Sequence, residues 1–370
     1  MNTTNFDMPQ MEQMTEIPPL TKPLGVQYYL DLAIKFHSSD MHLVAWHAPV
    51  YRINGQLVTQ PMPALGPEQI EEIVLPLLSP KQAKQFETSS EIDLAFQFDE
   101  NHSFRANLYR QRGHLSASIR IIPCVIRSLS ELGIPPIAAK LTRRHSGLIL
   151  VAGRAGHGKT TTMTHMVDQI NRERAARIIT IEDPIEFIYK SKLSLIVQRE
   201  VGNDTSSFAS GLKHALRQDP DIVVIGEMRD LDSISMALTT ADTGHLVMAT
   251  LHAPDAIEAI NRIIDVFPGD RQNQIRVQLA EHLTAIISQQ LLPRKDGAGR
   301  VLATEMCIPN MAIRNLIRRN SLSEIRGQME TGRDDMYTLE QNLSSLFLQG
   351  IISKETAQSH AKYPNLLKLT

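Results

Sequence analysis

Cysteine is almost absent from this chain of 370 residues, which has only Cys124 and Cys307. Two thiols cannot build a disulfide framework or a zinc site with four cysteine ligands. Long apolar runs are absent as well, since no segment approaches the roughly 18 apolar residues of a membrane-spanning helix. The first 22 residues are polar and lack the apolar segment of a signal peptide. The sequence therefore predicts a cytoplasmic protein that contacts a membrane only through a partner.

A strong excess of one charge is also lacking. The chain has 38 Lys and Arg against 40 Asp and Glu, a formal net charge of -2. No global positive field attracts nucleic acid, so we expect no nucleic-acid partner and disfavour a nucleic-acid translocase. Hydrophobic residues at 42% and charged residues at 21% are typical of a soluble protein, and the length predicts two or three domains.

The first third of the chain has the pattern of a small mixed domain. Residues 1–24 carry prolines among polar residues and predict a disordered tail. Residues 25–123 predict an α+β domain with an antiparallel sheet, a hairpin turn at Asn54-Gly55, and a linker at 124–144 that contains Pro135 and Pro136. Within that domain, helices are expected at 26–36 and 67–78, and strands at 41–44, 50–53, 92–98, 103–109 and 116–122.

From residue 145 the pattern changes to continuous apolar runs that alternate with helical stretches. Such alternation predicts an α/β domain with a mostly parallel sheet over 145–292. The strand signal fades beyond residue 292, so residues 293–370 are expected to form a helical region. The expected strands are 148–152, 177–181, 222–225 and 246–251, and the expected C-terminal helices are 312–318, 339–348 and 354–362.

The segment Gly153-Arg154-Ala155-Gly156-His157-Gly158-Lys159-Thr160 follows a buried strand and opens a helix. In a P-loop of this pattern, glycines let backbone N–H groups turn toward phosphate oxygens, and the helix N-terminus adds its positive end. The lysine contacts the β- and γ-phosphates and the hydroxyl binds Mg²⁺. We therefore predict binding of ATP with Mg²⁺, with contacts from Gly153, Gly156, His157, Gly158, Lys159, Thr160 and Thr161.

Acidic residues follow two of the other buried strands. Glu227 ends the run that begins at Asp221, and we expect it to polarise the attacking water and to support Mg²⁺ together with Thr160. The second acidic segment is 182–186, which follows the strand expected at 177–181. Glu186 is its favoured catalytic residue. Glu182 and Asp183 are explained equally well by a catalytic role and by hydrogen bonds that fix the turn.

Histidines flank one strand. His245 precedes the run 246–251 and His252 follows it. Taken alone, each fits a structural histidine as well as a nucleotide contact.

Taken together, these motifs resemble the secretion-type ring ATPases, and among them the branch that retracts type IV pili. The resemblance extends from Val26 to the C-terminus. It implies a PAS-like N-terminal domain, a RecA-like ATPase core and a C-terminal helical region. The segments that carry it are Ser39-Asp40-Met41-His42-Leu43, the P-loop, Thr180–Phe187, Asp219–Asp230, Thr243–His252 and Ala312–Arg318.

The resemblance implies more than the residues do by themselves. It implies a homo-hexamer at the inner membrane, in which Arg105 and Arg120 of the first domain reach the nucleotide across a boundary and His245 and His252 lie around it. It implies an inner-membrane platform protein as partner, pilin as the indirect target and a paralogous ATPase as a further partner. The helix at 312–318 is tied in that family to retraction.

Some features leave alternatives open. The family's loop usually reads Gly-Pro-Thr-Gly-Ser-Gly-Lys-Ser, and this chain differs from it at Arg154, Ala155, His157 and Thr160. Turnover is the property that Arg154 and His157 would change. An accessory retraction motor that assists another ring is the first alternative. An assembly or secretion ATPase is disfavoured, because those relatives usually carry a tetracysteine zinc module. A nucleotide-sensing scaffold without hydrolysis is the remaining one.

Overall fold

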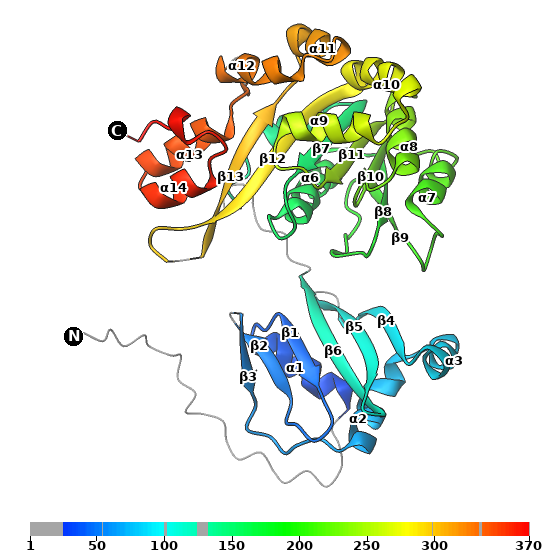
Figure 1. The fold of residues 1–370 in the computed structure, drawn as a ribbon. Coiled ribbons are helices and arrows are strands. Elements are labelled where there is room, and N and C mark those ends of the chain that lie inside the picture. Colours follow the sequence, from blue (N-terminus) through cyan, green and yellow to red (C-terminus); the bar gives the residue numbers. More distant parts are fainter. Residues whose placement is uncertain are drawn as a thin grey trace, which may run out of the picture. The chain divides into compact units, whose positions relative to one another are not determined.

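The computed structural model describes residues 25–53, 55–99, 102–123, 132–297, 299–332 and 335–369. The chain forms two compact units that divide between residues 124 and 125 (Figure 1). The tail expected at 1–24, Asn54 of the expected turn, and the first part of the expected linker, 124–131, lie outside the described residues.

The first unit is a six-stranded antiparallel sheet with helices against it, as the sequence predicts (Figure 1). The strands occur in the order β3-β2-β1-β6-β5-β4. Their bounds are β1 (Asp40–Leu43), β2 (Val50–Ile53), β3 (Gln56–Thr59), β4 (Glu91–Gln97), β5 (His102–Gln111) and β6 (His114–Pro123). The helices are α1 (Val26–Lys35), α2 (Pro67–Val74), the 3-10 turn η1 (Leu75–Leu77) and α3 (Pro80–Ser89).

Alternation and capping explain these elements. In β4 every second residue is exposed, and Ile92 and Leu94 face a core that also holds Phe104 of β5. This period of two is the pattern of a half-buried strand. Both α2 and α3 begin with proline, whose missing N–H costs nothing in the first turn, and the Ser79 hydroxyl accepts the N–H of Gln82 at the start of α3.

The second unit contains a seven-stranded sheet in the order β13-β12-β7-β11-β10-β8-β9. All neighbours are parallel except the pair β12 and β13. The strands are β7 (Gly147–Ala152), β8 (Arg177–Glu182), β9 (Leu195–Glu200), β10 (Ile222–Ile225), β11 (Leu246–Leu251), β12 (Leu283–Pro293) and β13 (Arg300–Cys307).

Helices cover both faces of this sheet (Figure 1). α5 and α6 pack on one face and α7 to α10 on the other. Their bounds are α5 (Ile137–Leu141), α6 (Lys159–Glu173), α7 (Phe208–Ala215), α8 (Leu231–Asp242), α9 (Ala256–Asp265) and α10 (Gly269–His282). The C-terminal elements are α11 (Met311–Arg318), η2 (Leu322–Glu324), α12 (Ile325–Glu330), α13 (Leu339–Leu348), α14 (Lys354–His360) and η4 (Pro364–Leu366).

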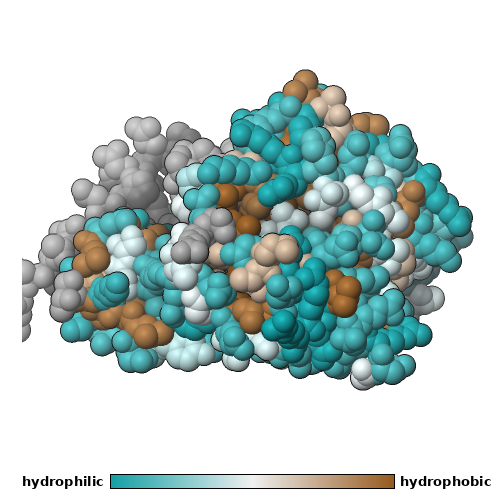
Figure 2. All heavy atoms as spheres, turned by 90° about the horizontal axis from the view of Figure 1, so that it is seen from above, coloured by the Kyte–Doolittle hydropathy of each residue, from teal (hydrophilic) through white to brown (hydrophobic). Residues whose placement is uncertain are grey.

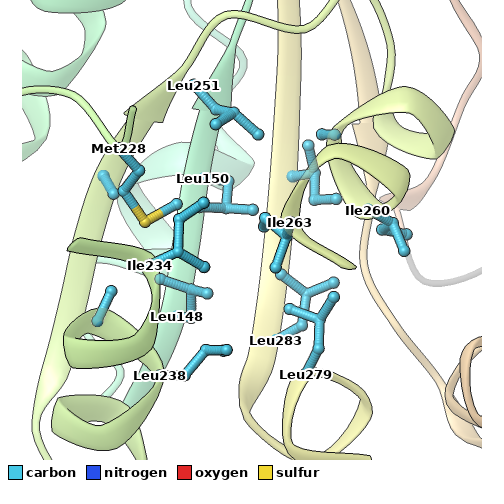
Figure 3. Packing of buried hydrophobic residues seen from close by; sticks show 14 of the residues in the cluster. Leu148, Leu150, Met228, Ile234, Leu238, Leu251, Ile260, Ile263, Leu279 and Leu283 are labelled. Carbon is cyan, nitrogen blue, oxygen red and sulfur yellow. The ribbon is translucent and has the colours of Figure 1, made fainter. Parts of the chain in front are cut away.

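The central strands are mostly apolar because each contributes to two cores. In β7, Leu148 and Leu150 pack toward α8 and α9, whereas Ile149 and Val151 pack toward α6. Figure 3 shows Leu148 and Leu150 beside Ile234, Ile263 and other residues of the first of these clusters. Burying a side chain of this size contributes roughly 1.5–3 kcal/mol, so the sheet centre is a rigid support for the loops that leave it.

The expectation that strands end near residue 292 is wrong, since β13 pairs with β12 along its length. Thr304 and Glu305 of β13 are polar yet buried, and they hide the strand pattern. Around β13 the C-terminal region is helical, as expected. Hydrophilic residues predominate on the face shown in Figure 2, where hydrophobic residues form small separate groups. In the described ranges, every helix is too short or too polar to span a bilayer.

Candidate active site

The P-loop connects β7 to α6 at the carboxyl edge of the parallel strands. Gly158 precedes α6 with φ of 83°, a left-handed conformation that favours glycine, and it leaves the helix N-terminus open. Gly156 also has positive φ, 76°. The loop therefore has the backbone form that directs N–H groups and the helix dipole at an anion.

A cleft of about 280 Å³ lies at this edge. It receives residues from the loops that follow the neighbouring strands β7, β8, β10 and β11, because the carboxyl ends of parallel strands meet at one edge. Six predicted site residues line it, namely Gly156, Lys159, Thr160, Glu186, Glu227 and His252. Further lining residues are Thr164, Glu182, Asp183, Tyr189, Arg229 and Thr250.

A chain of polar contacts joins the P-loop lysine to the acid after β10. Lys159 Nζ donates to the carbonyl oxygen of Arg154 at 3.2 Å and lies 3.5 Å from Nδ1 of His252. His252 Nε2 lies 3.0 Å from Oε1 of Glu227, and Arg229 contacts the other carboxylate oxygen at 2.7 Å. An ammonium group can only donate, so His252 accepts at Nδ1 and carries its proton on Nε2.

Burial sets the charge balance of the cleft. It lowers the pKa of Lys159, which is 8% exposed, while the carboxylates of Glu227 and Glu186 act in the opposite direction. Burial and the charge of Lys159 lower the pKa of His252 against the effect of Glu227. A neutral His252 between a cation and an anion fits the tautomer that the contacts require.

The acids after β8 have separate positions. Glu182 is 9% exposed; its Oε1 accepts from the hydroxyl of Thr180 at 2.6 Å and from the Gln198 amide at 3.0 Å. Burial raises its pKa. Glu186 is exposed at the rim of the cleft and Asp183 lies 3.5 Å from Arg229. Glu186 is therefore free to approach a ligand, whereas Glu182 is held by the protein.

Two of the predicted nucleotide-binding residues, His157 and Thr161, have side chains that lie outside the cleft. His157 points away from it, since its Nδ1 accepts the N–H of Leu291 on β12 at 3.0 Å. Thr161 is exposed on α6 and does not line the cleft. Contact of these two residues with a nucleotide, for which their backbone N–H groups are available, stays a prediction.

His245 lies at the opposite edge of the sheet. It precedes β11, whose six residues at about 3.3 Å each separate it from the P-loop edge by about 20 Å. Its Nδ1 is 3.0 Å from the Thr243 hydroxyl and 3.2 Å from the carbonyl oxygen of Thr240. The structure therefore places His245 away from the P-loop of its own chain, and its contact with a nucleotide at a subunit boundary stays a prediction.

The predicted arginines are in the first unit. Arg120 on β6 is 71% exposed, and its Nε donates to Asp40 of β1 at 2.8 Å. Arg105 on β5 lies 3.9 Å from Asp93. Their contact with a nucleotide stays a prediction.

Sequence reasoning gave no role to two residues that the structure places at the P-loop. Arg229 contacts Glu227, and the signal was its position two residues further along the same motif. Gln289 of β12 contacts the back of the loop. No local pattern marks it, because its partners are more than 120 residues away in the chain.

Arg314, the first arginine of the helix expected at 312–318, has a structural role. Arg314 on α11 donates to the carbonyl oxygens of Ala280, Glu281 and Leu283, at the end of α10 and the start of β12. It satisfies carbonyl groups that a helix C-terminus leaves unpaired. Ile313 and Ile317 are buried, so the expected amphipathic helix is confirmed.

The family model described as "Type II/IV secretion system protein" matches residues 26–365. The chain belongs to this family. Family membership accounts for the order of the motifs along the chain, from the first unit through the P-loop to α11.

Three named relatives are similar to this chain over most of their length. A "Twitching motility protein" of Neisseria gonorrhoeae is 42% identical over 86% of each chain. The "Type IV pilus retractation ATPase PilT" of Pseudomonas aeruginosa is 40% identical over 92% of this chain and 99% of its own. The "Type IV pilus ATPase PilU" of the same organism is 37% identical over 92% and 89%.

Among solved structures, that of "the Pilus Retraction Motor PilT and Bound ADP" superposes with a TM-score of 0.88 at 43% identity, over 93% of this chain and 99% of that one. The likeness extends through both units and the C-terminal helices. The chain is therefore an ATPase. It also has the fold that the sequence predicts.

Proposed function

We propose that this ATPase retracts a type IV pilus by removing pilin, and that it works as a homo-hexameric ring. The observation that carries the proposal is similarity over nearly the whole length of a protein named for pilus retraction, together with a P-loop cleft that keeps Lys159, Thr160 and Glu227 on one edge. PilU is similar over a comparable length at lower identity, so an accessory motor is the second candidate.

The cleft has the groups that phosphoryl transfer to water requires. The P-loop backbone and Lys159 hold the β- and γ-phosphates. Glu227 is the general base that orients water, and Arg229 and His252 fix its carboxylate from both sides. Glu186 lines the same cleft and is the second candidate acid.

Mg²⁺ fits this donor set. Within the described ranges, three or more His, Cys, Asp and Glu side chains do not gather into a group that could hold a metal. Mg²⁺ typically takes one or two protein ligands and completes its shell with phosphates and water, so the Thr160 hydroxyl and the Glu227 carboxylate are suitable ligands. When bound, the cation neutralises the charge on the phosphates.

Coupling to movement requires residues from outside the cleft. The Arg120 side chain is exposed and that of Arg105 is partly exposed, and we assign both to a nucleotide at a subunit boundary, where they would neutralise charge on the γ-phosphate. His245 is assigned to the same boundary. The ring would act on an inner-membrane platform protein, from a peripheral position on the cytoplasmic side, and a paralogous ATPase of the PilU kind is a further partner.

The test is Glu227→Gln in the full-length protein. Loss of the general base should lower kcat for ATP hydrolysis by about 100-fold or more while ADP binding persists. Glu173→Gln is the matched control, since Glu173 pairs with Arg143 and does not line the cleft. In a strain lacking its own retraction ATPases, the wild-type protein should restore twitching and reduce surface piliation, and Glu227→Gln should not.

Three outcomes would count against the proposal. Retraction by Glu227→Gln as the sole ATPase would refute the assigned chemistry. Restoration only when a second retraction ATPase is present would identify the accessory motor instead. ATP hydrolysis without any effect on piliation would refute the cellular role.

A further inference from the structure

The P-loop is held from behind by a buried glutamine of β12. The Gln289 side-chain amide donates to the carbonyl oxygen of His157 at 2.8 Å. Its carbonyl oxygen accepts the hydroxyl hydrogen of Thr162, on the first turn of α6, at 2.9 Å. Gln289 and Thr162 are 1% and 2% exposed. A single side chain thus ties the crest of the loop to the helix that follows it.

The loop lies so close to β12 that only glycine fits at its start. A Cβ on Gly153 would lie 2.7 Å from the backbone oxygen of Gln289, and φ at this position is 156°. A Cβ on Gly158 would lie 3.4 Å from the Gln289 amide nitrogen. The loop is therefore in van der Waals contact with this strand on the side opposite the cleft.

A second contact with β12 comes from His157, one of the residues at which this loop departs from the usual pattern. His157 Nδ1 accepts the backbone N–H of Leu291 at 3.0 Å. Leu291 follows Gln289 by two residues, so both lie on the same face of β12. Serine, the usual residue at this position, has a shorter side chain than histidine. The ring of His157 lines a separate cavity of about 430 Å³, beside Arg154 and His360.

We propose that Gln289 and His157 are positioning residues that fix the P-loop to β12 in its phosphate-binding form. They do not touch the cleft themselves. Gln289 holds the backbone of the loop and the first turn of α6, and His157 holds the loop to the strand through an unprotonated Nδ1. The inference rests on nucleotide binding by the P-loop and is independent of what the ATPase moves.

The tie through His157 depends on pH. Burial lowers the pKa of His157, and the charges of Arg154 and Lys159 in the loop, of Arg300 on β13 and of His360 at the end of α14 lower it further. Since the folded pKa lies below that of the unfolded chain, the tie is complete above about 6.5. The hydrogen bond from Leu291 is lost as the pH falls through the pKa of His157 in the folded protein, because a protonated Nδ1 can no longer accept it.

The glutamine is tested by the affinity of the full-length protein for ADP, measured by titration calorimetry at pH 8. Gln289→Met keeps the length of the side chain and removes both hydrogen bonds, so ADP should bind about tenfold more weakly. Gln349→Met is the matched control, because Gln349 is exposed directly after α13 and lines neither the cleft nor the cavity beside His157. The melting temperature without nucleotide identifies a variant that fails to fold. ADP affinity of Gln289→Met within twofold of wild type would overturn the assignment.

The histidine is tested by two substitutions, which also serve if Gln289→Met does not fold. In His157→Asn, Oδ1 takes the place of Nδ1 and does not titrate; in His157→Ala, the acceptor is gone. At pH 8, His157→Asn should match wild type and His157→Ala should bind ADP about fivefold more weakly. As the pH falls below about 6.5, binding by wild type should weaken relative to binding by His157→Asn, whose acceptor does not titrate. Equal affinities of His157→Ala and wild type at pH 8, or an affinity of His157→Asn as low as that of His157→Ala, would refute the positioning role.

Discussion

Replacing the buried Glu305 by glutamine should stabilise the protein at neutral and alkaline pH. Glu305 lies on β13 and is 6% exposed. Its Oε1 accepts the N–H of Ala256, the first residue of α9, at 2.8 Å. Burial raises the pKa of Glu305 from 4.5 to about 7, and the neighbouring charges of Asp255 and Glu340 act in the same direction. A glutamine keeps the oxygen that accepts the Ala256 N–H and has no charge to bury, and it gives up the weaker contribution of the backbone N–H of Leu339.

The sign and size follow from proton linkage. The unfolded chain ionises at Glu305 near 4.5 and the folded chain near 7, so between these values the folded state binds more protons and stability falls as the pH rises. At about 1.4 kcal/mol per pH unit, this interval corresponds to a loss of about 3 kcal/mol above pH 7. Glu305→Gln should not show that loss of stability. Near pH 4.5 the free energies of unfolding of the two proteins should differ little.

The assay is urea unfolding of both proteins at pH 5 and pH 8, followed by circular dichroism, with the exposed Glu281→Gln as control. The free energy of unfolding of Glu305→Gln relative to wild type should rise from pH 5 to pH 8 by about 2–3 kcal/mol, and that of the control should stay constant. A difference that is the same at both pH values, or that falls, would refute the reasoning.

Two further predictions concern the loop and α11. Gly153→Ala should abolish measurable ADP binding in calorimetry, because its Cβ would lie 2.7 Å from a backbone oxygen of β12, and an unchanged affinity would contradict the close approach. Arg314→Ala should lower the free energy of unfolding by about 2 kcal/mol, because the carbonyls at the end of α10 lose their donor. The exposed Arg318→Ala should have little effect in the same urea titration, and equal effects of the two substitutions would count against the capping role.

Periodicity predicted most of the fold. The run at residues 246–251 matches β11, and the alternating strands of the first unit match β4 to β6 within a few residues. These elements bury their side chains in regular order, so local pattern and tertiary packing agree. β13 was missed because Thr304 and Glu305 are buried polar residues. Their partners, the Tyr337 hydroxyl and the Ala256 N–H, are not neighbours in the sequence.

The candidate site was predictable where a motif fixes the backbone. Lys159 and Thr160 line the cleft because the helix N-terminus follows directly from the glycine spacing, and Glu227 lines it because it follows a parallel strand. The direction of a side chain within a loop is set by what packs behind it. His157 faces β12 for that reason, and no spacing rule in the chain predicts the N–H that it accepts.

β12 carries two attachments at its opposite ends. At the start of β12, the Arg314 guanidinium of α11 donates to the carbonyl oxygen of Leu283. Towards the end of β12, Gln289 and the N–H of Leu291 donate to His157 of the P-loop. Ladder hydrogen bonds to β7 and β13 keep the strand from sliding between them. β12 therefore connects the P-loop mechanically to α11 at the opposite edge of the sheet. A displacement of β12 along its axis would move both attachments.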